Sequence, residues 1–124
     1  MVWQAWTEPE MMKRWFGSDP RGHVLRASAE PRVGGSFEVT FANSDGSRYT
    51  CFGRYEELQQ DAKLVFSWSW RERPGASELV RILFEPRDGG TLMRFEHVDI
   101  DPETTHNYAA GWKSTFEKLE HALG

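Results

Sequence analysis

The sequence predicts a two-layer α+β domain in which one antiparallel sheet packs against one long C-terminal helix. Two observations predict this fold. Between Val24 and His97, apolar and polar residues alternate with a period of two, and turn signals separate the alternating runs. After Asp101, apolar residues recur at spacings of three and four. A sheet with one apolar face and a helix with one apolar stripe bury these surfaces against each other, so residues 1–124 form a single domain.

The N-terminal segment predicts two short helices. An apolar cluster around Trp3 and Trp6 is followed by a sequence that matches a capping box, with Thr7 as N-cap, Pro9 in the first turn and Glu10 reaching back. We therefore expect a break at Thr7 and a helix end at Gly17. The second helix carries four apolar residues at helical spacing: Met11, Met12, Trp15 and Phe16.

The middle of the chain predicts a meander of short strands. The clearest alternating runs cover residues 37–41, 48–58, 64–70, 80–84 and 93–97. Gly, Pro, Asn and Asp residues predict turns at 43–46, 60–61, 74–75 and 88–90. Strands joined by such tight turns must pair antiparallel.

The C-terminal segment predicts a helix of roughly 20 residues, about 30 Å long. Asp101 is the expected N-cap and Pro102 the first helical residue. The apolar stripe of this helix consists of Tyr108, Trp112, Phe116, Leu119 and Leu123.

Composition argues against several classes of protein. The only cysteine is Cys51, which excludes an intrachain disulfide and fits a reducing, cytoplasmic location. The net charge is -4 and no run of Lys and Arg occurs, so we expect no nucleic-acid partner. No apolar run approaches the roughly 20 residues of a membrane span, and the residues after Met1 do not read as a signal peptide.

The candidate site residues are aromatic. Aromatic residues make up 14% of the chain, and we expect many of them to face the space between sheet and helix. Such a set either packs as a solid core or walls an apolar ligand cavity, and the sequence leaves both open. The candidate ligand-binding residues are Phe37, Phe66, Trp68, Trp70, Phe84, Phe95, His97, Trp112 and Phe116.

His97 is the polar member of this set. A histidine titrates near neutral pH and could act as a general acid or base. Asp99 and Asp101 follow closely, but neighbours on a strand alternate between faces. We therefore interpret His97 as either a hydrogen-bonded core residue or a pocket-lining residue, and we predict no catalytic residue. Cys51, His97 and His106 lack the spacing of metal ligands, and we predict neither a metal nor a cofactor.

Arginines at positions 71, 73 and 81 could form a small basic patch on adjacent strands. Glu72 and Glu78 lie close to them in the sequence, and we interpret the region as a solvated face.

Six sequence blocks resemble the activator-of-Hsp90-ATPase-homologue-1-like (AHSA1-type) family. In order they are VWQAWTEPEMMKRWFG, VGGSFEV, DGSRYTCFGRYEEL, LVFSWSW, LVRILFEPRDGGTLMRFEH and GWKSTFEKLEHAL, and together they cover nearly the whole chain. The resemblance implies the helix-grip fold of the START-like (Bet v 1-like) superfamily, in which a curved sheet wraps around the C-terminal helix.

The chain departs from the family pattern at its start. Family members usually begin with a strand before the Val-Trp block, whereas the sequence here starts at that block, so this first strand is either cut off or truly missing. If it is missing, a sheet edge stays open and invites pairing with a second chain, so a homodimer is one expectation.

The resemblance implies three alternative functions. The first is non-enzymatic binding or carriage of a small hydrophobic molecule, with a stress-related role. The second is an enzyme similar to polyketide cyclases and aromatases, for which His97, Tyr55 and Tyr108 are the available polar groups. The third is a module that contacts an Hsp90-type chaperone. A shared fold does not choose among them.

Overall fold

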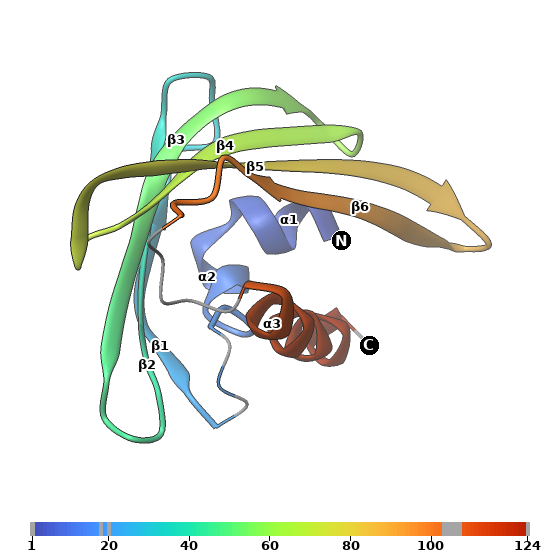
Figure 1. Ribbon diagram of the computed structural model, residues 1–124. Helices are drawn as coiled ribbons and strands as arrows, with labels where there is room; N and C mark the ends of the chain where they lie inside the picture. The colour runs from blue at the N-terminus through green and yellow to red at the C-terminus, as the bar shows by residue number, and fades with distance from the viewer. Residues whose placement is uncertain (1, 18, 20, 103–107, 124) are drawn as a thin grey trace.

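The computed structural model describes residues 2–17, 19, 21–102 and 108–123. Their sheet curls over the helices, as Figure 1 shows, and the predicted α+β class and helix-grip architecture are confirmed. The elements are α1 (Val2–Thr7), α2 (Pro9–Met12), β1 (His23–Ala29), β2 (Ser36–Ala42), β3 (Arg48–Gln59), β4 (Lys63–Trp70), β5 (Arg73–Arg87), β6 (Gly90–Val98) and α3 (Tyr108–Leu123).

The sheet is an antiparallel meander. Its strand order is β1-β2-β3-β4-β5-β6, so every strand pairs with its neighbour in sequence. Within the described sheet, β1 and β6 are the two edge strands. The predicted turns at 43–46, 60–61 and 88–90 are confirmed between the strands that they were expected to join.

The turn predicted at residues 74–75 is wrong. The chain turns at residues 71–72, and residues 74–75 lie inside β5. The register between β4 and β5 shifts here: Trp68 pairs with Glu78, and Trp70 pairs with Arg73. An advance of two residues along β4 is therefore matched by five residues along β5. This irregularity absorbs the extra residues, and Gly75 adopts a φ of 93° there, which favours glycine.

The two N-terminal helices are confirmed, but the predicted capping box is wrong. Thr7 is the last residue of α1, and its hydroxyl donates to the Trp3 carbonyl at 3.0 Å, so it is engaged in its own helix. Glu8 is the N-cap of α2 and makes no side-chain capping bond. Glu10 pairs with Lys13 at 2.9 Å instead of reaching back, and α2 ends at Met12, before Gly17.

The apolar stripe of the C-terminal helix packs against the sheet. Trp112 and Leu119 are buried, and the other stripe residues are half-buried against the core. The predicted helix start after Asp101 involves residues 103–107, which lie outside the described part of the chain. In the portion of the chain that the structure describes, no helix has the length and apolar character needed to cross a membrane.

Trp6 lies at the centre of the aromatic core. Its ring lies 4.7 Å from Trp15, 6.1 Å from Phe95 and 6.1 Å from Trp112, measured between ring centroids. Its indole Nε1 donates to the Met93 sulfur at 3.3 Å. Helix α1 therefore fills part of the space between the sheet and α3 (Figure 1).

Candidate functional site

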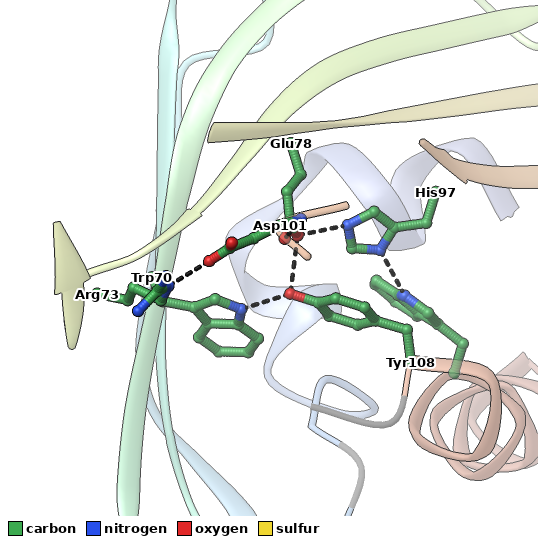
Figure 2. A network of polar contacts seen from close by, with 7 residues as sticks. Trp70, Arg73, Glu78, His97, Asp101 and Tyr108 are labelled. Carbon is green, nitrogen blue, oxygen red and sulfur yellow. Dashed lines mark hydrogen bonds and ion pairs between the residues drawn. The ribbon is translucent and has the colours of Figure 1, made fainter. Parts of the chain in front are cut away.

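A buried carboxylate is the centre of the main polar cluster. Glu78 lies on β5 with only 5% of its surface exposed. Its Oε1 accepts hydrogen bonds from His97 Nε2 at 2.8 Å and from the Tyr108 hydroxyl at 2.7 Å. Its Oε2 accepts from the backbone N–H of Asp101 at 2.9 Å. Figure 2 shows these donors converging on Glu78 from β6, α3 and the segment after β6.

His97 is held in one tautomer. The Trp112 indole N–H, which can only donate, lies 3.0 Å from His97 Nδ1, so Nδ1 accepts and Nε2 carries the proton that is donated to Glu78. Burial away from water lowers the pKa of His97, while the hydrogen bond and the charge of Glu78 oppose this effect. The histidine is therefore neutral at neutral pH.

The cluster extends from β6 to the protein surface. The Trp70 indole N–H donates to the Tyr108 hydroxyl at 2.8 Å, and this hydroxyl in turn donates to Glu78. The Asp101 carboxylate forms an ion pair with the Arg73 guanidinium, whose side chain is 45% exposed. We call Trp70, Arg73, Glu78, His97, Asp101, Tyr108 and Trp112 the Glu78 network (Figure 2).

The Glu78 network holds elements together. Its side chains come from β4, β5, β6 and α3, and the side chains of Glu78 and His97 are each 4% exposed. A general base needs a free lone pair within reach of a substrate proton. The one acceptor nitrogen of His97 is occupied by the Trp112 N–H, and Glu78 uses three of its roughly four acceptor positions on His97, Tyr108 and Asp101. These bonds link the C-terminal helix to the sheet.

The nine predicted ligand-binding residues fall into three groups. Phe37, Phe66, Trp68 and Phe84 are buried in the aromatic core. Trp70, His97 and Trp112 belong to the Glu78 network. Phe95 and Phe116 line a groove between β6 and α3. That all nine surround one ligand stays a prediction.

The β6–α3 groove has a volume of about 760 Å³. Seven apolar residues line it, and Glu120 is its one charged residue. The apolar residues are Val2, Leu92, Met93, Phe95, Phe116, Leu119 and Leu123.

A reactive cysteine and a metal site are two further kinds of functional site to consider. Cys51 is fully buried on β3, and burial raises the pKa of its thiol, which disfavours the reactive thiolate. Among the described residues, no three His, Cys, Asp or Glu side chains are grouped to hold a metal ion.

Sequence reasoning missed Glu78. We expected it on a solvated face with Arg71, Arg73 and Arg81, and that prediction is wrong because Glu78 is buried. The signal was the alternation of β5: Glu78 is in phase with Val80, Ile82 and Phe84, which all face the core. The three arginines form no joint patch, since each pairs with a carboxylate, those of Glu38, Asp101 and Glu96 respectively.

Comparison with known proteins identifies the family. The model of the family described as activator of Hsp90 ATPase homolog 1-like protein matches residues 1–124, so the chain belongs to this family. No curated protein matches the chain significantly.

Solved structures from several bacteria share the fold. A protein from Nitrosomonas europaea is 24% identical with a TM-score of 0.82, and the match covers 98% of this chain and 84% of that one. An AHSA1-like protein from Aeromonas hydrophila is 24% identical with a TM-score of 0.77, covering 98% and 81%. The AHSA1 protein from Silicibacter pomeroyi is 24% identical with a TM-score of 0.80, covering 98% and 87%.

Proposed function

We propose that this member of the activator-of-Hsp90-ATPase-homologue-1-like family binds a small hydrophobic molecule in the β6–α3 groove, as a carrier or sensor. The observation that carries the proposal is the groove itself. Its volume of about 760 Å³ lies within the range of about 300–1,000 Å³ that is usual for ligand pockets. Its lining is mostly apolar, as in most small-molecule sites.

The lining also favours a neutral ligand. Phe95 and Phe116 offer aromatic surface, and Met93 adds a flexible, polarizable side chain. Glu120 is the one charged lining residue, and its carboxylate repels an anion. The ligand class is therefore an uncharged, apolar molecule.

The two alternatives have weaker support. An enzyme resembling polyketide cyclases or aromatases would use the Glu78–His97 pair, but the hydrogen-bonding atoms of that pair already bind one another, Tyr108, Trp112 and Asp101. A chaperone contact rests on the family description alone.

A chaperone partner would also need an exposed apolar patch. The exposed large apolar residues Leu25, Val33, Leu83 and Ile100 lie on four separate segments. A homodimer, a cytoplasmic location and a stress-related role stay predictions.

Titration with N-phenyl-1-naphthylamine, a neutral apolar fluorophore, tests the proposal. We expect a rise in fluorescence that saturates, and a thermal shift that corresponds to about 2.7 kcal/mol at 100 times the dissociation constant. Leu123→Glu places a carboxylate in the groove and should weaken binding at least about tenfold, because a charge facing an apolar ligand loses its hydration.

The matched control is Leu83→Glu, which places the same charge on a β5 residue that is 36% exposed. It should bind the fluorophore like the wild type. Equal binding by Leu123→Glu, or no binding by the wild type at micromolar concentrations, would contradict the proposal. A panel of uncharged aromatic and aliphatic metabolites would then extend the titration to natural ligands.

A further inference from the structure

A second pocket lies on the opposite side of α3. Its volume is about 650 Å³, and residues of the turn after α2, the start of β1 and α3 line it. From α3 it uses residues 114, 117, 118, 121 and 122, whereas the β6–α3 groove uses residues 116, 119, 120 and 123. The two sites share no residue.

The charge of this pocket is opposite to that of the chain. Lys13, Arg14 and Lys118 bring three positive charges to its lining, and Glu117 brings one carboxylate. The lining is therefore positive by two, in a chain with a formal net charge of -4. His23 and His121 add two further hydrogen-bonding side chains.

Two of the cations form no ion pair with the side chains that the structure describes. Lys13 pairs with Glu10 at 2.9 Å, but within the described residues neither Arg14 nor Lys118 forms an ion pair. The Lys118 ammonium donates to the carbonyl oxygens of Phe16 at 3.3 Å and Asp19 at 3.0 Å. An ammonium has three donors, so these two bonds hold it in place and leave one for a ligand.

The environment of Lys118 favours an anion. Its side chain is half-buried, and desolvation lowers its pKa, an effect that the charge of Asp19 partly opposes. A negative group bound beside it would compensate the lost hydration. Phe16, Val24 and Ala122 complete the pocket with apolar surface.

We propose that this pocket binds an organic anion, with its acidic group on Lys118 and Arg14 and its apolar body against Phe16, Val24 and Ala122. The ligand class is a small aromatic or aliphatic acid. This inference is independent of the β6–α3 groove, whose single charged residue is acidic.

A matched pair of fluorophores tests the proposal. 8-Anilino-1-naphthalenesulfonate and N-phenyl-1-naphthylamine share one ring system, and only the first carries a sulfonate. Arg14→Gln and Lys118→Met should each weaken sulfonate binding at least about tenfold, because each removes a charge-assisted hydrogen bond. Neither should change binding of the neutral fluorophore by more than about twofold, since that compound belongs in the groove.

Two variants control for damage to the fold. Glu117→Gln removes the one carboxylate of the lining and should tighten sulfonate binding about two- to threefold, which a folding defect does not do. Lys63→Met removes another half-buried lysine, on β4, and should leave binding unchanged. The inference is overturned if Arg14→Gln and Lys118→Met both bind the sulfonate like the wild type. It is also overturned if the bound sulfonate perturbs amide resonances of β6 and not those of residues 22–24 and Lys118.

Discussion

At the residue scale, Glu78 is the buried acceptor on which three polar contacts of the described residues converge. Its two carboxylate oxygens accept three hydrogen bonds, from His97, Tyr108 and the backbone of Asp101. All three donors lie close to the C-terminal helix or on it. Removing the carboxylate would leave these donors without their acceptor in a site shielded from water.

Glu78→Ala should therefore lower the free energy of unfolding by about 3 kcal/mol, as expected for buried donors left unpaired. Urea denaturation followed by tryptophan fluorescence measures this loss. The matched control is Glu85→Ala on the same strand, where an exposed carboxylate pairs with Arg94 at 3.0 Å. That change should cost less than about 1 kcal/mol. Equal losses for the two variants would contradict a special role for Glu78.

Burial lowers the pKa of His97, and the hydrogen bond from Trp112 adds a second effect in the same direction that can be tested separately. Protonation of Nδ1 would place two N–H donors against each other, because the Trp112 indole already donates to that nitrogen. Trp112→Phe should raise the pKa of His97 by about one unit, which corresponds to the loss of one hydrogen bond. NMR titration of the ring resonances measures it.

The control for that titration is Trp70→Phe. It also removes an indole donor from the Glu78 network, but this donor binds Tyr108 and not His97. The pKa of His97 should stay the same there. A similar rise in both variants would mean that burial of the ring, and not the Trp112 bond, keeps His97 neutral.

At the element scale, the approach of β3 to β4 depends on Gly53. A Cβ atom there would lie 1.8 Å from the carbonyl oxygen of Ser67 and 2.7 Å from its carbonyl carbon. Both are backbone atoms, so the strand itself would have to move. Gly53→Ala should destabilise the protein by about 3 kcal/mol, as overpacking in a closely packed site does.

Gly90→Ala is the control for this substitution. Gly90 begins β6, and a Cβ there would come no closer than 3.6 Å, to the Arg87 carbonyl oxygen. Thermal unfolding should show a large drop in melting temperature for Gly53→Ala and a change of less than about 2 °C for Gly90→Ala. Equal melting temperatures would show that β3 and β4 can separate locally at little cost.

The elements themselves were mostly predictable from the sequence. Period-two alternation, as in Phe37, Val39 and Phe41, identified β2 to β6, because one face of each strand is buried. The turn at residues 74–75 was misplaced because Gly75 serves an irregularity inside β5 and not the hairpin. The same irregularity explains the wrong prediction for Glu78. Arg73 lies on one side of it and Glu78 on the other, so closeness in the sequence did not place the two residues on the same solvated face.

At the scale of the whole molecule, the candidate site was only partly predictable. Alternation placed Phe95 and His97 on the inner face, but not the distances between them and α3. The sequence marked Trp6 as part of an apolar cluster, yet its position at the centre of the core depends on how α1 packs under the curled sheet. Such contacts join residues far apart in the chain, and periodicity carries no information about them.

The dependence of stability on pH also belongs to the whole molecule. His97 has a lowered pKa in the folded protein, so below about pH 6.5 the unfolded chain binds a proton that the folded protein does not. Unfolding then takes up protons, and the free energy of unfolding should fall as the pH falls from about 6.5 towards the folded-state pKa. One group contributes at most about 1.4 kcal/mol per pH unit.

At alkaline pH the sign reverses. Burial raises the pKa of the Cys51 thiol and of the Tyr55 hydroxyl, so above about pH 9 the unfolded chain releases protons that the folded protein retains. Urea denaturation from pH 5 to pH 10.5 should therefore give a plateau near pH 7–8.5 with losses on both sides. His97→Gln should be less stable overall but should flatten the acidic side, and Cys51→Ala should reduce the slope between about pH 9 and 10. An acidic slope that persists unchanged in His97→Gln would assign it to other groups and would contradict the neutral, buried state of His97 in the Glu78 network.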